Sequence, residues 1–221
     1  MLELNNHPMT YNGWILRVRH ATQKPSRLML MLHGWTGDEN SMWIFTRKFP
    51  DDLWIVAPRG LYPSERGGYS WRPPRSLQDE DRGLPTLSDL KPAAEALIRL
   101  VDDLSASVNV DATTFEVAGF SQGGALVNVL TLLYPQRIHK AAVLSGFMPD
   151  GADDLIERRV LKGKPFFVAH GEQDQLVPFE RCQRSLELLE QAGAQVTFCD
   201  ADVGHKLSVD CLRGLEAFFK E

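Results

Sequence analysis

Short apolar runs recur along the chain, and most of them lack the alternation of apolar and polar residues that marks a strand with one face in water. Continuous apolar runs of this length are typical of strands in a parallel sheet that helices cover on both faces. The segments that fit this description are 14–18, 28–32, 53–57, 115–118, 141–144, 166–169 and 196–198.

Between these runs, apolar residues recur at steps of three and four positions, which predicts amphipathic helices. The pattern covers residues 90–104, 182–189 and 212–219, and Ser208 is placed to cap the last of these helices. The apolar stretch 125–133 predicts a further helix. Strands that alternate with helices favour a mostly parallel sheet, whose functional groups gather at the carboxyl ends of the strands.

The whole chain, residues 1–221, is expected to form a single α/β domain with a mostly parallel central sheet flanked by helices on both faces. No repeat or linker interrupts the succession of strands and helices, so we expect no separate cap domain. Residues 61–85 depart from this succession, because these 25 residues hold four prolines and four arginines and show no clear periodicity. Loops of this length are often functional, and we expect this one to form a wall of the active site.

Composition and charge exclude several classes of protein. Hydrophobic residues make up 43% of the 221 residues and charged residues 24%, which is sufficient for an ordinary globular core. The net charge is −5 and no basic block is present, so nucleic acid is not an expected partner. No apolar run approaches the roughly 20 residues of a membrane-spanning helix. The first residues resemble no secretory leader, so the expected location is cytoplasmic.

The three cysteines, Cys182, Cys199 and Cys211, are odd in number and show no Cys-x-x-Cys spacing. This pattern fits neither a disulfide framework nor a zinc site. We expect all three to be reduced thiols packed inside the protein, with no metal and no other cofactor.

A candidate nucleophile lies where the apolar run 115–118 turns into the helical stretch 125–133. The intervening residues 119–124 read Gly-Phe-Ser-Gln-Gly-Gly, which is the G-x-S-x-G pattern in the strand-to-helix context that it requires. This context predicts that Ser121 occupies a strained turn that faces the positive end of a helix dipole. A negatively charged acyl-transfer intermediate would be stabilised at this position.

A serine nucleophile needs a histidine base, and His205 is the best candidate. It follows the last predicted strand and precedes the last helix, in the loop 202–205. Two other histidines end predicted strands, but both lie within motifs that shape a loop. These two are His33 and His170, and we expect the other three, His7, His20 and His139, at the surface.

The carboxylate that orients the base is expected between serine and histidine in the chain, because this architecture uses the order Ser, Asp or Glu, His. Asp174 meets this condition directly after the apolar run 166–169. Glu172 and Asp202 are rivals, although Asp202 is close enough to His205 to share its loop.

An oxyanion hole requires two N–H donors, one from the residue after the nucleophile and one from an early strand-to-helix loop. Gln122 supplies the first. The sequence His-Gly-Trp-Thr-Gly-Asp at 33–38 follows the strand 28–32, and we predict Trp35 as the second donor, with Thr36 as the alternative.

Taken together, these motifs resemble one family. They read HGWTGD at 33–38, APRG at 57–60, GYSW at 68–71, GFSQGG at 119–124, HGEQDQLVP at 170–178 and GH at 204–205. Their order is similar to that of the α/β-hydrolase superfamily, and specifically to its phospholipase/carboxylesterase family, which includes acyl-protein thioesterase-like enzymes. The similarity covers about residues 28–219.

The resemblance implies a catalytic triad of Ser121, Asp174 and His205, with Trp35 and Gln122 as oxyanion donors. The family's usual Trp-Phe-Asp is absent, because Trp71 is followed by Arg72 and Pro73. This departure weakens the expectation of acyl-protein or lysophospholipid substrates.

The predicted activity is that of a serine carboxylesterase acting on small to medium esters through an acyl-enzyme. Trp71, Phe120 and Leu176 are expected to contact the substrate, whereas the arginines near the long segment either face solvent or bind an anionic substrate. Acyl-thioesterase, lysophospholipase and non-catalytic ligand-binding homologue remain as alternatives. A small-molecule ester is the expected partner, and nothing in the sequence indicates an oligomeric state. The arginines are Arg59, Arg66, Arg72, Arg75 and Arg82.

Overall fold

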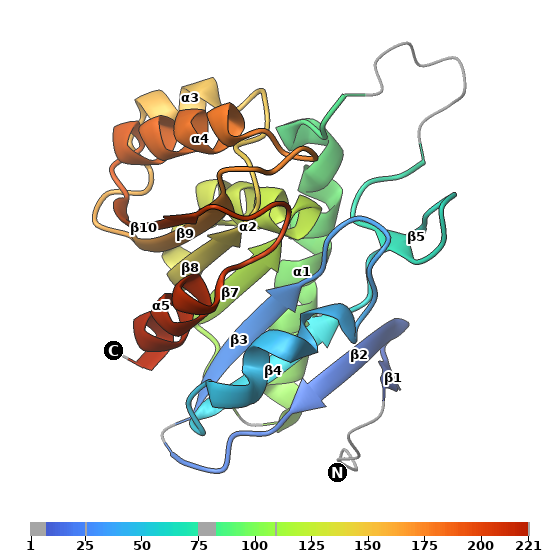
Figure 1. The fold of residues 1–221 in the computed structure, drawn as a ribbon. Helices are drawn as coiled ribbons and strands as arrows, with labels where there is room; N and C mark the ends of the chain where they lie inside the picture. Colours follow the sequence, from blue (N-terminus) through green and yellow to red (C-terminus); the bar gives the residue numbers. More distant parts are fainter. Residues whose placement is uncertain (1–7, 25, 75–82, 109, 221) are drawn as a thin grey trace.

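The computed structural model describes residues 8–24, 26–74, 83–108 and 110–220. An eight-stranded sheet runs through the molecule in the order β1-β2-β4-β3-β7-β8-β9-β10 (Figure 1). From β4 to β10 all neighbours are parallel, whereas β1 and β2 are antiparallel additions at one edge. The strands are β1 Met9–Tyr11, β2 Trp14–Arg19, β3 Arg27–Leu32, β4 Leu53–Pro58, β7 Phe115–Phe120, β8 Ile138–Leu144, β9 Pro165–Gly171 and β10 Gln195–Ala201.

Helices cover both faces of this sheet, as the continuous apolar runs predict. The first face carries α1, α2, α3 and α4, and the opposite face carries η1 and α5 (Figure 1). Consecutive residues of β3 illustrate why both faces must be apolar, since Leu30 joins the core on the first face and Met29 the core on the second. The helices are η1 Ser41–Lys48, α1 Leu87–Val108, α2 Gln122–Leu133, η2 Pro135–Arg137, α3 Asp153–Glu157, α4 Phe179–Gln191 and α5 Val209–Lys220.

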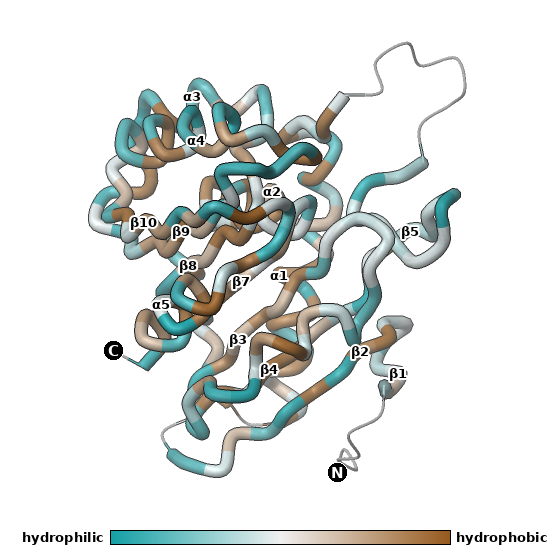
Figure 2. The backbone as a smooth tube through the Cα atoms, viewed as in Figure 1, coloured by the Kyte–Doolittle hydropathy of each residue, from teal (hydrophilic) through white to brown (hydrophobic). Residues whose placement is uncertain are grey.

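The distribution of hydrophobic residues follows this arrangement, with apolar segments concentrated along the central strands (Figure 2). The α/β fold class is confirmed, and each strand predicted from an apolar run is present within a few residues of its expected bounds. The predicted cap of the last helix is also present, because the hydroxyl of Ser208 accepts a hydrogen bond from Cys211 N–H at 3.1 Å.

The segment 61–85 is more regular than its sequence indicates. It begins with a small antiparallel hairpin formed by β5 Tyr62–Pro63 and β6 Tyr69–Ser70. An isolated bridge between Gly37 and Tyr69 then joins this hairpin to the loop after β3. Backbone hydrogen bonds to a distant loop are invisible to sequence periodicity, so pattern analysis missed both short strands. Residues 75–82 of the predicted wall, with Arg75 and Arg82, lie outside the described residues.

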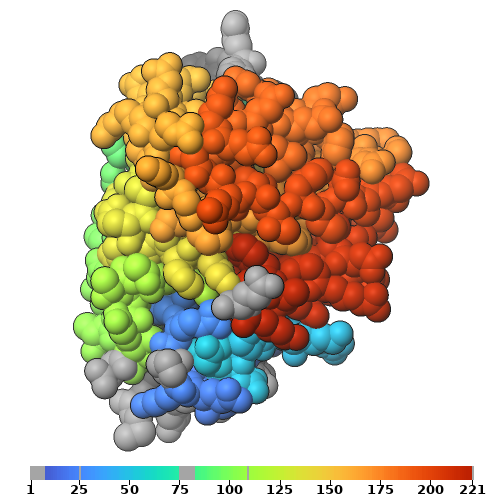
Figure 3. Space-filling view, turned by 90° about the vertical axis from the view of Figure 1, so that its left-hand side faces the viewer, coloured from blue at the N-terminus to red at the C-terminus, as the bar shows by residue number. Residues whose placement is uncertain are grey.

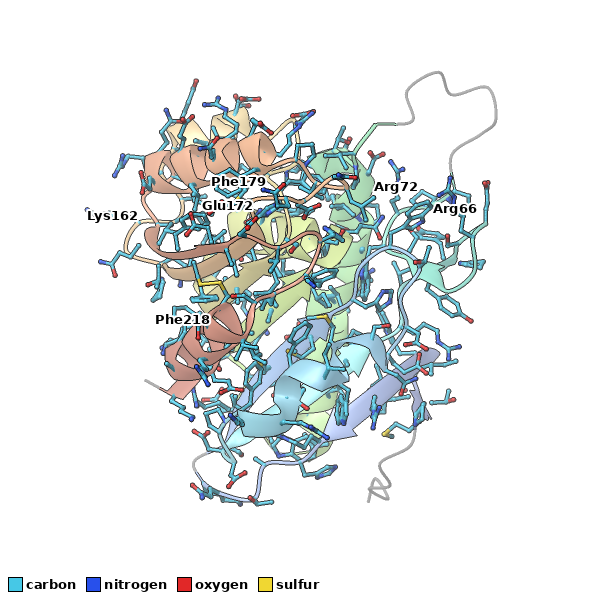
Figure 4. All side chains as sticks on the ribbon, viewed as in Figure 1. Arg66, Arg72, Lys162, Glu172, Phe179 and Phe218 are labelled. Carbon is cyan, nitrogen blue, oxygen red and sulfur yellow. A yellow bond between two sulfur atoms is a disulfide. The ribbon has the colours of Figure 1, made fainter. Side chains whose placement is uncertain are left out.

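The prediction of three reduced thiols is wrong for two of them. Cys199 of β10 and Cys211 of α5 form a disulfide, with their Cα atoms 5.6 Å apart (Figure 4). Cys182 is free and buried, as expected. Cysteine spacing carries no information on which strand and helix pack together, and that packing brings this pair into contact. Disulfides are rare in reducing compartments, and the cytoplasmic location stays a prediction.

Within the described part of the chain, no helix has both the length and the apolar character needed to cross a bilayer.

Candidate active site

Ser121 lies at the sharp turn between β7 and α2, at the carboxyl end of the sheet. Its φ of 53° and ψ of −116° are unusual for a residue with a side chain, which is the strain expected of an exposed nucleophile. Two glycines allow the turn to be this close. A Cβ on Gly119 would lie 2.2 Å from Gly123 O, and a Cβ on Gly123 would lie 2.1 Å from Leu32 O.

Asp174 is buried in the loop between β9 and α4, and three donors surround its carboxylate. Its Oδ1 accepts hydrogen bonds from the backbone N–H groups of Leu176 and Val177, both at 2.9 Å. Its Oδ2 lies 2.6 Å from Nδ1 of His205. The rival carboxylates Glu172 and Asp202 are exposed, so of the three candidates the structure brings Asp174 to the histidine. Such a bond fixes the ring so that Nε2 is left for proton transfer.

His205 lies beside the nucleophile turn. The centre of its ring is 4.8 Å from that of Phe120, the residue that precedes Ser121. The loop of His205 also closes over the end of β9, where a Cβ on Gly171 would lie 2.2 Å from both Val203 O and Gly204 O. Among the described residues no hydrogen bond joins the Ser121 hydroxyl to His205. Bonds of this kind often tighten only when substrate binds.

The loop after β3 brings a second set of backbone donors to the same place. A Cβ on Gly34 would lie 3.3 Å from Cβ of Ser121, so this loop packs directly on the nucleophile turn. Thr36 N–H already donates to Tyr69 O at 3.0 Å, which removes Thr36 as an oxyanion donor. In the described chain the N–H of Trp35 has no acceptor, as an oxyanion donor requires.

The side chain of His33 stabilises the start of this loop through two hydrogen bonds. The N–H of Gly60 donates to His33 Nε2 at 2.8 Å, so Nε2 is unprotonated and Nδ1–H donates to Gly34 O at 2.7 Å. Burial lowers the pKa of His33, which keeps this neutral tautomer. The imidazole is therefore a structural support of the loop.

Trp71 is fully buried and lies beneath the loop. The expectation that it contacts substrate therefore does not match its position. Its indole N–H donates to His33 O at 2.8 Å, and its backbone N–H donates to the Gln122 side chain at 3.0 Å. Gln122 in turn donates to the Ser70 hydroxyl at 3.1 Å. Trp71 thus links the β5–β6 hairpin, the loop after β3 and the first residue of α2.

A second histidine, His170, contacts the carboxylate and was missed as part of this site. Its buried Nε2 lies 2.8 Å from Val177 O and 3.4 Å from Asp174 Oδ2. Burial is the largest effect on this group and lowers its pKa, so the ring is neutral and Nε2–H donates to Val177 O. The four-residue spacing of His170 and Asp174 was visible in the sequence, but only the loop geometry brings the two side chains together.

The remaining predicted site residues lie around this centre. Phe120 is partly buried against His205, whereas Leu176 is 70% exposed beside Asp174. Arg59 is committed to a salt bridge with the buried Glu39 at 2.7 Å. Arg66 and Arg72 lie near the β5–β6 hairpin (Figure 4), and the guanidinium of Arg66 is 5.3 Å from the ring of the half-exposed Trp35.

Comparison with known proteins gives consistent matches. The profile of the Phospholipase/Carboxylesterase family matches residues 15–221. A probable carboxylesterase of Arabidopsis thaliana, named SOBER1-like, is 37% identical over 107 residues, which are 48% of this chain and 41% of that protein. The chain therefore spans less than half the length of this curated relative.

Two further proteins are similar over more of their length. Acyl-protein thioesterase 1 of Kluyveromyces lactis is 28% identical over 184 residues, which are 75% of this chain and 77% of that protein. The crystal structure of the Bacillus cereus carboxylesterase covers 95% of this chain and 94% of its own, with a TM-score of 0.82 and 20% identity. At that identity the likeness is one of fold.

Proposed function

Because the chain belongs to the phospholipase/carboxylesterase family, we propose that it is a serine carboxylesterase with Ser121 as nucleophile, His205 as base and Asp174 as its orienting acid. The observation that carries this proposal is the 2.6 Å contact between His205 Nδ1 and the buried Asp174, beside the strained Ser121. A carboxylate held in this way stabilises the imidazolium that forms when the base takes a proton.

The reaction begins when the Ser121 hydroxyl attacks the carbonyl carbon of the ester while His205 Nε2 takes its proton. The carbonyl oxygen becomes negatively charged and is stabilised by the backbone N–H groups of Trp35 and Gln122. His205 then returns the proton to the leaving alcohol, and the acyl group stays on Ser121. Water attacks this acyl-enzyme by the same route in reverse, which releases the acid.

Replacing Ser121 by alanine tests the assignment of the nucleophile. We expect Ser121→Ala to lower the turnover of p-nitrophenyl butyrate by roughly 10⁴-fold or more, because only the oxyanion donors and binding remain. A fluorophosphonate should label the native protein at Ser121 alone. Ser145, buried after β8, is a matched control whose replacement by alanine should preserve labelling. Labelling at another residue, or near-native activity in Ser121→Ala, would refute the proposal and favour a non-catalytic ligand-binding protein.

For substrate range, we propose small to medium esters. The β5–β6 hairpin is fixed to the loop after β3 through Tyr69, and the buried Trp71 anchors its end, so this wall is preformed. The half-exposed Trp35 and the exposed Leu176 offer apolar contact to a short acyl chain. Phe120 is a third candidate contact.

A series of p-nitrophenyl esters from acetate to palmitate, measured with chelator present, tests this range. We expect kcat/KM to peak at short or medium chains and to be unaffected by the chelator. A steady rise toward palmitate would favour a lipase or lysophospholipase. The matching thioesters belong in the same panel, because a preference for them would favour the acyl-thioesterase alternative.

A further inference from the structure

The Cys199–Cys211 disulfide closes the segment that carries His205. It joins β10, the last strand of the sheet, to the first turn of α5, and residue 205 lies midway between the two cysteines. We propose that this disulfide is a positioning pair for His205, and that a dithiol reductant slows ester hydrolysis by opening it. The inference rests on the proposed role of His205 as base.

Few hydrogen bonds hold the segment itself, although Leu207 packs against the core and the backbone at Val203 and Gly204 lies close to Gly171. None of residues 202–208 is fully buried. In the described chain, two hydrogen bonds connect it to the loop after β9: Gln173 N–H donates to Val203 O at 3.0 Å, and His205 itself reaches Asp174 at 2.6 Å. Its other backbone bonds are local, such as that from Lys206 N–H to Gly204 O. The position of the imidazole therefore depends on how firmly the two ends of the segment are fixed.

Each end of the segment lies where a regular element ends or begins. β10 is an edge strand that pairs with β9 alone among the described strands, and the segment enters α5 at its first turn. The first residue of α5, Val209, is 66% exposed, whereas Cys211 is buried. Edge strands and helix ends can sample local unfolding, and a cross-link across the segment restricts the open conformations. A displacement of about 1 Å at a catalytic group can lower the rate by as much as about 100-fold.

We expect reductant to reach this disulfide from the side of Cys199, because Cys211 is buried. Cys199 is partly exposed, and the C-terminal elements, red in Figure 3, form part of the outer surface. One thiolate of a dithiol attacks the Cys199 sulfur, forms a mixed disulfide with it and releases Cys211. The second thiol of the reagent then attacks this mixed disulfide and releases Cys199. The sulfur–sulfur bond of the protein breaks, each cysteine gains a proton, and the dithiol loses two electrons and becomes a cyclic disulfide.

Cys182 does not compete in this exchange. Burial is the main cause that raises its pKa to about 12, so the thiolate is not populated near neutral pH. Opening of the disulfide is therefore expected to give two reactive thiols and no rearranged pairing. Cys182→Ser supplies a matched control, since it removes a cysteine without touching the pair.

The experiment compares oxidised protein with protein reduced by dithiothreitol and then desalted without oxygen, because free thiols cleave p-nitrophenyl esters. Thiol titration of the unfolded samples should rise from one to three cysteines per chain. We expect kcat for p-nitrophenyl butyrate to fall by roughly tenfold or more while KM changes less than twofold. Oxidised glutathione should restore the rate. The double variant Cys199→Ser, Cys211→Ser should have the low rate in both conditions, and Cys182→Ser should respond as the native protein does.

Reduction of His205→Ala separates positioning from general stabilisation. With no base to position, its residual rate should be the same in both redox states, whereas a general loss of structure would lower that rate too. An unchanged kcat after verified reduction, or a fall matched by loss of circular dichroism, overturns the positioning role. Absence of ester hydrolysis and of Ser121 labelling in oxidised protein would instead refute the proposed function.

Discussion

Replacing Asp174 by asparagine should disable the base while preserving the fold. The two side chains have nearly the same shape, but an amide presents one acceptor and one donor. Oδ1 of Asp174 accepts the N–H groups of Leu176 and Val177, so the amide oxygen must stay on that side. Turning the amide over would leave both N–H groups facing a donor, at about 1–3 kcal/mol for the buried N–H of Val177.

The NH₂ group of the introduced asparagine would therefore face Nδ1 of His205 and require that nitrogen to be an acceptor. The proton would move to Nε2, which then cannot take the proton of Ser121. We expect kcat/KM to fall by about 10⁴-fold, equivalent to about 5.5 kcal/mol of transition-state stabilisation. The thermal midpoint should change by only a few degrees, because the hydrogen bonds to the backbone persist.

The assay is kcat/KM for p-nitrophenyl butyrate, with folding checked by circular dichroism. Asp202→Asn is the matched control, since Asp202 is exposed in the loop of His205, and it should retain most of the activity. If Asp174→Asn kept more than a tenth of the native rate, the tautomer argument would be wrong. A larger loss in Asp202→Asn would identify Asp202 as the acid.

Two other predictions concern packing and pH. Gly123→Ala would place a Cβ 2.1 Å from Leu32 O and should reduce activity at least tenfold and lower the thermal stability. Gly204→Ala, whose Cβ would have its nearest neighbour at 3.8 Å, should be tolerated. Equal effects of the two substitutions would contradict the close approach at the nucleophile turn. Burial lowers the pKa of His33 and of His170. Near and below a pH of about 6.5 the unfolded chain therefore binds more protons than the folded one, and the free energy of unfolding decreases as the pH is lowered. Burial raises the pKa of Glu116, which affects the pH dependence in the opposite direction, so His170 must be tested against a variant. The free energy of unfolding in urea is measured for the native protein and His170→Gln from pH 7.5 to 5. An unchanged slope of this free energy against pH in the variant would refute this role of His170.

The sequence by itself determined the strands, the nucleophile turn and the order of the candidate triad. These features are local. An apolar run such as 28–32 must be covered on both faces wherever it lies. The glycines of residues 119–124 permit a tight turn between a strand and a helix. The carboxyl ends of parallel strands then meet at one edge of the sheet, which is why Ser121, Asp174 and His205 could be proposed together.

Tertiary structure decided which groups touch. The sequence favoured Asp174 over its rivals Glu172 and Asp202, and the direction of two loops brings Asp174 to His205. Trp71 looked like a substrate contact, but the hairpin pairing at Tyr69 places it in the interior. The disulfide depends on α5 packing against β10, a distance that cysteine spacing does not contain. Such contacts depend on the packing of elements far apart in the chain, whereas periodicity reports only what each element buries.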